Sequence, residues 1–343
     1  MFRIKRKHRS IGYDIGSHSL KAVEITKSAS GLKITEVVLR SLPKGAVNDA
    51  RVLKPAQVRE ALEGMNALLS PSGARVVISA GLPNRDVFMR NRALPRAPRA
   101  EARRSLPSQM QLGAATRQEE MIFDLVIQDP EGTSSEMEAL CVAAKKSQVM
   151  ARQNLFGDAD IEVDVVDVGL CALHNLADHL GVYQPGTAIH LHVGTSVVEI
   201  AVVRDGIIQM VRKVMSSALD PLYQQIRSSG RIGSEDPGKA VRAQDEGLFD
   251  DLIDEWAETL LADLRQTVNQ APPPGGGPVQ VLMSGAGAMV QGMDRRLAGD
   301  GEFSVERLDP FSSFIVSEDL PPEILSAGPI YALAVGYALR GID

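Results

Sequence analysis

Runs of apolar residues predict strands over most of the first part of the chain. One apolar strand breaks at Ile15-Gly16-Ser17 and resumes at residues 21–26, and residues 32–39 alternate between apolar and polar side chains. Residues 54–69 have the spacing of an amphipathic helix, and residues 75–80 form a short buried run. The order strand, strand, strand, helix, strand indicates a sheet that is covered by a helix.

A second hairpin of the same kind opens the second half of the chain. The apolar run from Ile189 breaks at Gly194-Thr195-Ser196 and resumes at residues 200–203. When the two hairpins are written side by side, His192 aligns with Asp14. Such hairpin tips expose backbone N–H groups that can cradle phosphate. Two similar units far apart in one chain therefore predict duplicated lobes that face each other across a cleft.

The segment that follows the first set of strands has its own pattern. It reads strand, helix, strand, turn, strand and helix, which predicts a small inserted β-α-β-β-α subdomain at residues 83–158. The segment is rich in arginine: Arg85, Arg90, Arg92, Arg96, Arg99, Arg103 and Arg104. These cations form either a solvated face or a surface that docks a partner or lipid. The candidates for binding a partner are Arg85, Arg90, Arg92 and Arg96.

The rest of the chain completes both lobes. Apolar residues 161–168 predict a strand, and helices are expected at residues 170–180, 219–228, 250–268 and 330–339. A Pro-rich and Gly-rich stretch at 271–278 indicates a flexible linker, and a strand then enters Ser284-Gly285-Ala286-Gly287, a turn that allows close approach of a ligand. The expected domains are a basic arm (1–10), a first lobe (11–82, 159–184 and 325–343), the insertion (83–158) and a second lobe (185–324).

Composition narrows the class of protein. The 343 residues are 44% hydrophobic with a mean hydropathy of -0.05, which is typical of a globular protein that does not span a membrane by itself. Cys141 and Cys171 have no metal or redox spacing, which favours a reducing compartment. A net charge of -6 and 4% aromatic residues argue against nucleic-acid binding. The basic arm is either a solvated terminus or weakly attracted to anionic lipid.

Motifs of common enzymes are missing from the sequence. The chain has no Ser nucleophile elbow, no Walker-type Gly-Lys-Ser/Thr loop and no His-Glu-x-x-His. His190 and His192 lie on one side of a strand and could chelate a transition metal together with His174 or His179. The simpler interpretation of His192 is a structural histidine of the core or cleft.

Three small-residue turns in this order resemble the first phosphate loop, second phosphate loop and adenosine loop of the actin/Hsp70/sugar-kinase superfamily. From Ile11 to Asp343 the chain resembles the PilM family of type IV pilus assembly proteins. The pieces that carry this resemblance are Asp14-Ile15-Gly16-Ser17, Lys21, Leu94-Pro95, Val142-Ala143-Ala144-Lys145-Lys146, Val166-Asp167-Val168, Arg204-Asp205-Gly206 and residues 334–341.

The resemblance implies a duplicated, actin-like (ribonuclease H-like) two-lobed α/β fold with the inserted subdomain. It also implies ATP with Mg²⁺ between the lobes, with Asp14 holding the metal through water. The positions that match the family's nucleotide site are Gly16, Ser17, Ser19, Lys21, Gly194, Thr195, Ser196, Glu255, Gly285, Ala286 and Gly287.

The partner that the resemblance implies is the N-terminal peptide of a bitopic inner-membrane protein, PilN. The protein would then be a cytoplasmic adaptor, peripheral to the inner membrane, that links the pilus platform to cytoplasmic motor proteins. The related protein FtsA ends in an amphipathic membrane helix, but residues 330–343 lack a basic polar face, so such an anchor is not expected here. The partner peptide is expected where the insertion meets the first lobe.

The chain departs from the family at the positions that support hydrolysis. His192 stands in place of the second metal-holding acid, and Gly169 replaces a Glu that follows the Val-Asp-Val strand. Ser216-Ser217 replaces a Gly pair, and Glu258 replaces an Arg. ATP is therefore expected as a structural ligand, with hydrolysis weakened or lost. The alternatives are an active Mg-dependent ATPase that cycles within the platform, or a component of a related type II secretion platform.

Overall fold

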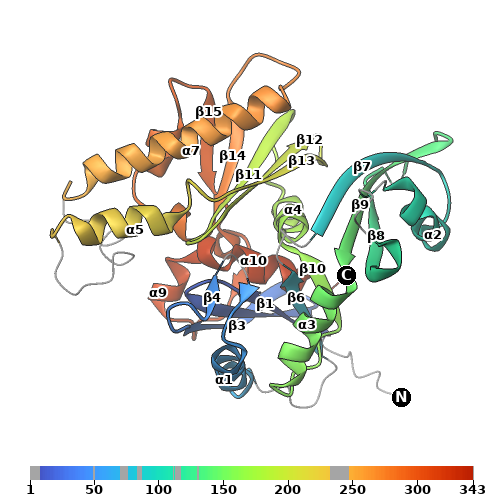
Figure 1. Ribbon diagram of the computed structural model, residues 1–343, viewed down its shortest axis with the longest axis horizontal. Helices are drawn as coiled ribbons and strands as arrows, with labels where there is room; N and C mark the ends of the chain where they lie inside the picture. Colours follow the sequence, from blue (N-terminus) through green and yellow to red (C-terminus); the bar gives the residue numbers. More distant parts are fainter. Residues whose placement is uncertain are drawn as a thin grey trace.

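The computed structural model describes residues 8–48, 51–69, 76–82, 87–110, 112, 117–129, 131–231 and 247–342. Within them, two sheets form two lobes, and a smaller sheet stands beside them (Figure 1). Residues 1–7 of the basic arm and Arg85 lie outside the described residues.

The first lobe is a six-stranded sheet with the order β10-β6-β1-β2-β3-β16. Its strands are β1 (His8–Ile15), β2 (Ser19–Ser28), β3 (Gly31–Ser41), β6 (Val76–Leu82), β10 (Val165–Val168) and β16 (Ile315–Val316). Strands β1 to β3 form an antiparallel meander, and β6 and β10 continue the sheet in parallel. Because β16 pairs with β3, the chain returns to this sheet before the expected boundary at residue 324.

Helices cover both faces of the first sheet. Helices α1 (Pro55–Asn66) and α3 (Lys146–Gly157) close one apolar core, and α4 (Gly169–Leu180) and α10 (Gly328–Leu339) close the other. The predicted strand at 161–168 is shorter than expected, since Ile161 bonds back to the end of α3 and only β10 pairs with the sheet. The small elements of this lobe are β4 (Val47–Asn48), β5 (Arg51–Val52), η4 (Pro310–Ser312) and α9 (Pro322–Leu325).

The second lobe repeats the strand order of the first. Its strands are β11 (Thr187–Val193), β12 (Val198–Arg204), β13 (Ile207–Val214), β14 (Val279–Ser284) and β15 (Phe303–Arg307). Here too, an antiparallel meander is followed by two parallel strands, in the order β13-β12-β11-β14-β15. The repeated topology agrees with the duplicated lobes predicted from the two hairpins.

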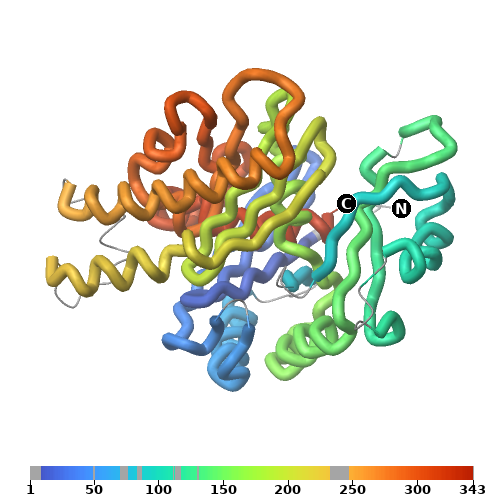
Figure 2. The backbone as a smooth tube through the Cα atoms, turned by 45° about the horizontal axis from the view of Figure 1, so that its top comes forward, coloured from blue at the N-terminus to red at the C-terminus, as the bar shows by residue number. Residues whose placement is uncertain are grey.

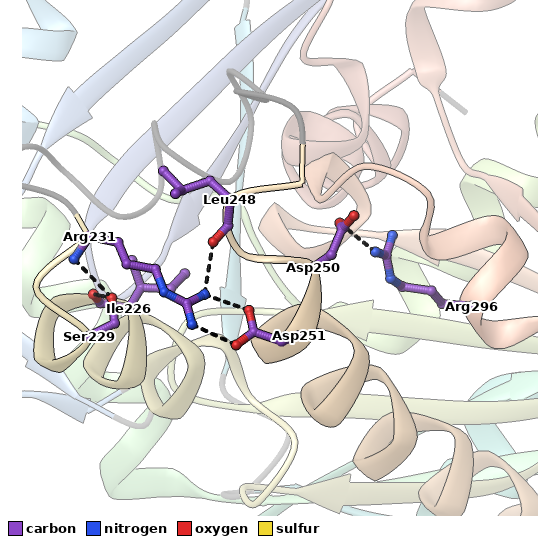
Figure 3. Close-up of polar contacts among 7 residues, drawn as sticks. All are labelled: Ile226, Ser229, Arg231, Leu248, Asp250, Asp251 and Arg296. Carbon is purple, nitrogen blue, oxygen red and sulfur yellow. Dashed lines mark hydrogen bonds and ion pairs between the residues drawn. The ribbon is translucent and has the colours of Figure 1, made fainter.

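Helices α5 (Leu219–Ser228), α7 (Asp250–Gln270) and α8 (Met293–Leu297) cover the outer face of the second sheet. Figure 3 shows how arginine side chains join them. Arg231 forms a fork with the Asp251 carboxylate at 2.5 and 2.7 Å and bonds the Leu248 carbonyl at 2.8 Å. Arg296 bonds Asp250 at 2.8 Å. These planar contacts hold the start of α7 against α5 and α8.

The insertion is a three-stranded antiparallel sheet, β7-β9-β8, that stands beside both lobes (Figure 2). Its elements are β7 (Val87–Pro95), α2 (Arg99–Gln109), η2 (Gln118–Glu120), β8 (Met121–Ile127) and β9 (Glu136–Lys145). Side chains tie it to the edge strand β13: Gln128 accepts from the Ile208 N–H at 2.9 Å, and Asn91 donates to the Ile208 carbonyl. The insertion therefore satisfies both backbone polar groups of Ile208 on this edge strand.

Helix α10 lies between the two sheets, and glycines bring the backbones there into direct contact (Figure 1). A Cβ atom at Gly12 of β1 would overlap the backbone of α10, and one at Gly336 of α10 would overlap the Ala172 carbonyl of α4. Gly81 of β6 leaves room for the Tyr337 ring. No side chain can be inserted at these crossings without moving an element.

We expect Gly336→Ala to destabilise the fold by about 3 kcal/mol or more, because its methyl group meets backbone that cannot yield. Gly64→Ala is the matched control, since that position is inside α1 with only the Arg40 side chain nearby. This control should be neutral or stabilising by about 0.5–1 kcal/mol through helix propensity. Urea unfolding of both variants measures the difference, and equal stabilities would contradict the close-contact argument.

Candidate functional site

The candidate site is a cavity of 730 Å³ between the two lobes. Both hairpin turns line it, together with the turn that follows β14. From the sequence-predicted set, the cavity is lined by Asp14, Gly16, Ser17, Ser19, Lys21, Gly194, Thr195, Ser196, Gly285 and Ala286. The two lobes thus bring together residues that lie far apart in the chain.

The two hairpin turns have the same construction. The N–H of Gly16 donates to the Ser19 carbonyl at 3.0 Å, and the N–H of Gly194 donates to the Val197 carbonyl at 2.9 Å. A Cβ atom at Gly16 would lie 3.0 Å from that Ser19 oxygen, and one at Gly194 would lie 2.9 Å from the Val197 oxygen. Glycine is therefore favoured in both turns for the same steric reason.

The carboxylate stands on the first strand of the first hairpin but on the second strand of the second hairpin. In the first hairpin Asp14 pairs with Lys21, and the Lys21 Nζ lies 3.0 Å from the Asp14 Oδ2. In the second hairpin His192 stands at the position of Asp14, and Glu199 at the position of Lys21. Glu199 is buried and lines the cavity. The second lobe therefore does supply a carboxylate to the cleft, from the strand opposite the expected one.

His192 is an uncharged polar group at neutral pH. Burial lowers its pKa to about 4, with Asp14 opposing this shift and Lys21 adding to it. Its Nδ1 lies 3.0 Å from the Ser284 hydroxyl on the neighbouring strand β14. The imidazole thus occupies the place of an acid without carrying either charge.

The tips of the hairpins touch across the cleft. The hydroxyls of Ser17 and Ser196 are 2.5 Å apart, and the His18 Nε2 lies 3.9 Å from the Asp220 carboxylate at the start of α5. These contacts join the first lobe to the second at the point where both turns line the cavity.

In the turn after β14, Gly285 and Gly287 pack against the second hairpin, whereas Ala286 faces the cavity. Gly285 has a φ of +82° and lies against the Val193 carbonyl, so it allows the turn to approach the second hairpin. Ala286 begins η3 (Ala286–Met289) and lines the cavity. Gly287 is buried under the Val193 side chain and does not line it. Glu255 also lies away from the cavity, on the exposed face of α7.

Several lining residues were missed by the sequence reasoning. Arg152 from α3 and Tyr337 from α10 are buried at the cavity, next to Gly169. Tyr223 and Arg227 line it from one face of α5. The i, i+4 spacing of Tyr223 and Arg227 shows that they share one face of α5. The sequence alone does not show that this face meets the cleft.

The predicted arginine surface is largely engaged within the insertion. Arg96 bonds the Asp129 carboxylate at 2.7 Å and the Ser134 carbonyl at 2.7 Å, which fixes the β8–β9 turn. Arg92 donates to the Gln109 carbonyl at 3.4 Å, at the end of α2. Arg90 is exposed on β7. The described arginines of the insertion therefore lie on the side of α2, and none of these lines the cavity described next.

A second cavity of 250 Å³ lies where the insertion meets both lobes. We call it the junction cavity. Its lining comprises Val126, Ile127, Gln128 and Leu140 of the insertion, Asp167, Cys171, His174, Asn175, Asp178 and Arg340 of the first lobe, and Gly206 and Ile208 of the second. The Arg340 Nε is 3.2 Å from the Asp167 Oδ2, and neither atom has a hydrogen-bond partner among the described residues. Burial raises the pKa of Asp167, and Arg340 opposes that rise.

Comparison with known proteins places the chain in a family. The family model of type IV pilus assembly protein PilM matches residues 12–342. The chain belongs to the PilM family. A solved "PilM-PilN type IV pilus biogenesis complex" contains a chain that is 20% identical with a TM-score of 0.80, and the match covers 97% of this chain and 98% of that one.

The fold has relatives outside the PilM family as well. Ethanolamine utilization protein EutJ from Carboxydothermus hydrogenoformans is 14% identical with a TM-score of 0.53, over 96% of this chain and 89% of that one. The predicted actin-like α/β fold is thus confirmed. None of the described helices combines the length and apolar character needed to cross a membrane.

The histidines that were considered as metal ligands are arranged differently. His174 and His190 both bond the Tyr183 hydroxyl, at 2.6 Å each, whereas His192 bonds Ser284. Within the described parts of the chain, no three His, Cys, Asp or Glu side chains gather to hold a metal ion.

The shifted pKa of His192 predicts a pH-dependent stability. Its folded pKa of about 4 lies below the unfolded value of 6.5, so the unfolded chain binds more protons between these values. Stability should fall as the pH drops from 6.5 towards 4. In His192→Asn this loss should be smaller by about 1–2 kcal/mol, a figure reduced for the partial exposure of the ring.

Urea unfolding at several pH values measures this difference. His179→Asn is the matched control, because His179 is exposed at the end of α4 and stacks on Phe314. The control should keep the pH slope of the wild type. An unchanged slope in His192→Asn would refute the assignment.

Proposed function

We propose that this chain is a cytoplasmic, actin-like adaptor of the type IV pilus assembly platform, peripheral to the inner membrane. It binds ATP as a structural ligand between its lobes and the N-terminal peptide of a PilN-like protein at the junction cavity. The observation that carries the nucleotide part is the pair of matching glycine turns that frame one cleft. The family assignment favours a pilus platform over a type II secretion platform.

The residues of the cleft fit a nucleotide. The turns at Gly16 and Gly194 line the same cavity, and small-residue turns of this kind can present backbone N–H groups that suit phosphate oxygens. Lys21 supplies a cation beside them, and Gly285 permits close approach on the third side. The bound nucleotide would supply the polyphosphate that joins the two lobes.

The cleft fits a magnesium ion less well than it fits phosphate. Asp14 is already paired with Lys21, and the neutral imidazole of His192 is a poor ligand for a hard cation. Glu199, opposite His192 in the hairpin, also lines the cleft, as does Asp220 at the start of α5. Asp14 and Glu199 are the residues that would hold Mg²⁺ through water.

Weak hydrolysis follows from the composition of the cleft. Gly169 lines the cavity and carries no carboxylate to position a water molecule. Asp167, two residues earlier, contributes its side chain to the junction cavity and pairs with Arg340 there. Glu199 is the one observation that favours the alternative of an active Mg-dependent ATPase, so turnover must be measured.

The junction cavity fits a short apolar peptide. Val126, Leu140 and Ile208 offer apolar walls, and the ion pair of Asp167 and Arg340 lies beside them. The cavity lies where the partner was expected, between the insertion and the first lobe. Under this proposal, a bitopic partner holds the protein at the inner membrane, where platform and motor proteins assemble.

The nucleotide proposal predicts binding without turnover. ATP should bind the wild type, and phosphate release should stay at background with or without Mg²⁺. Lys21→Met should weaken ATP binding roughly 10- to 100-fold, because a charge-assisted hydrogen bond is lost. Lys27→Met, on the same strand but bonded to the Ile342 carbonyl away from the cleft, should bind like wild type. Calorimetry and a phosphate-release assay measure both quantities, and turnover well above background would support the ATPase instead.

The partner proposal predicts which surface of the insertion matters. Val126 is 43% exposed and lines the junction cavity, so Val126→Asp places a charge on its wall without entering the core. This variant should weaken binding of the PilN-like N-terminal peptide at least tenfold. Arg90→Glu, on the arginine side of the same sheet, should bind the peptide like wild type. The opposite pattern, measured by fluorescence anisotropy, would assign the partner to the arginine surface.

A further inference from the structure

We propose that Arg152 takes the place of a divalent cation in the cleft. Its guanidinium neutralises the terminal phosphate, so that this chain binds a nucleoside triphosphate without Mg²⁺ and prefers it to the diphosphate. The inference rests on the proposed function, which places a nucleotide between the lobes. It adds the residue that sets how many phosphates the bound nucleotide carries and whether a metal accompanies them.

Helix α3 holds Arg152 inside the molecule. Arg152, Leu155 and Phe156 form the buried face of this helix, and the Phe156 ring packs edge-on against Tyr13 of β1 with 5.3 Å between the centroids. Arg152 is 7% exposed, and it lines the cleft. An arginine is always charged in proteins, so its burial costs free energy unless negative charge lies near it. The cleft must therefore supply negative charge beside Arg152.

Two carboxylates of the cleft supply part of that charge. Burial raises the pKa of Tyr337 well above its usual value, the negative charges of Asp14, Glu199 and Asp167 add to the rise, and Arg152 opposes it. Asp14, Glu199, Arg152 and Tyr337 all line the cleft. The guanidinium and the two cleft carboxylates thus lie near one buried hydroxyl, one on each lobe and one on α3.

This cluster marks the inner end of the cleft. Arg152, Glu199 and Tyr337 are buried, whereas Leu53 lines the cleft from an exposed position at its mouth. A Cβ atom at Gly81 would overlap the Tyr337 ring, so the ring packs directly on β6 at this end. A nucleotide that enters through the mouth reaches the inner end with its terminal phosphate.

The charges at the inner end do not favour an additional divalent cation. Lys21 already lies 3.0 Å from Asp14, and Arg152 is a second cation beside Asp14 and Glu199. His192 is neutral there, since burial lowers its pKa to about 4. Magnesium is usually held by one or two carboxylates together with the phosphates of the substrate. Here two protein cations balance the two carboxylates before any metal enters.

The cleft as a whole suits an anion. Its described lining contains the carboxylates of Asp14, Glu199 and Asp220 and a larger number of Lys and Arg side chains: Lys21, Lys44, Arg152 and Arg227. The lining therefore carries a net positive charge when its histidines are neutral. This balance attracts a polyphosphate and repels a free divalent cation.

The chemistry of the guanidinium explains a preference for the triphosphate. Its planar N–H groups form paired, charge-assisted hydrogen bonds with phosphate oxygens. A third phosphate reaches Arg152 at the inner end, whereas a diphosphate held by the same Gly16 and Gly194 turns leaves this contact unmade. Arg152 therefore distinguishes the two nucleotides by the terminal phosphate alone.

Calorimetry of the purified wild-type chain tests the inference directly. The probes are the non-hydrolysable ATP analogue AMPPNP and ADP, each titrated in EDTA and again in MgCl₂. The AMPPNP affinity should differ by less than about threefold between the two buffers, and in EDTA AMPPNP should bind at least about tenfold more tightly than ADP. Binding of AMPPNP that requires Mg²⁺, or equal affinities for the two nucleotides, would refute the inference.

Arg152→Met tests the residue itself, because it removes the guanidinium and keeps a long side chain. In EDTA its AMPPNP affinity should fall roughly 10- to 100-fold, with the ADP affinity within about threefold of wild type. Arg152→Lys, which keeps the charge but not the planar group, should lie between the two. Arg204→Met is the matched control, since Arg204 bonds the Pro272 carbonyl at 2.8 Å and does not line the cleft. It should bind both nucleotides like wild type.

The outcomes separate this inference from the proposed function. An equal loss of AMPPNP and ADP affinity in Arg152→Met assigns the residue to the fold and refutes its role at the terminal phosphate. The wild-type titrations decide the question of Mg²⁺ even where that variant does not fold, as checked by circular dichroism. If AMPPNP binds only with Mg²⁺, the inference fails while the proposed nucleotide site stands. If neither nucleotide binds in either buffer, the proposed function itself fails, and the inference fails with it.

Discussion

The direct backbone packing of α10 is the constraint on which the rest of the structure depends. Glycines at positions 12 and 336 allow α10 to touch both β1 and α4, and the inner face of the second sheet packs against the same layer. This layer sets the separation of the sheets. It therefore also fixes how far apart the two glycine turns stand, and hence the size of the cleft between them.

The duplicated lobes show how a site can change its chemistry while keeping its geometry. Both turns use a glycine with the same hydrogen bond, but the charged pair Asp14 and Lys21 becomes His192 and Glu199 in the second hairpin. Backbone amides bind phosphate through the shape of the turn, so this exchange leaves phosphate binding possible. Metal-assisted hydrolysis depends on the positions of carboxylates, so replacing Asp by His at position 192 would affect hydrolysis. Phosphate binding and hydrolysis can therefore change independently, because they depend on different atoms.

Most elements could be predicted because their signals are local. The strand–turn–strand pattern revealed both hairpins, and apolar spacing revealed the main helices. Glu199 was missed because cross-strand register, which places it opposite His192, was not followed past the turn. Glu255 was predicted from a family position, yet the rotation of α7 about its axis directs it to solvent. Strand β16 has two residues and no periodicity of its own; its pairing with β3 is a tertiary event.

A cleft of this kind can be useful without hydrolysis. A ligand that binds only the folded, closed arrangement stabilises it by about 2.7 kcal/mol when present at 100 times its dissociation constant. A nucleotide held by the Gly16 and Gly194 turns would therefore favour one arrangement of the two lobes without being hydrolysed.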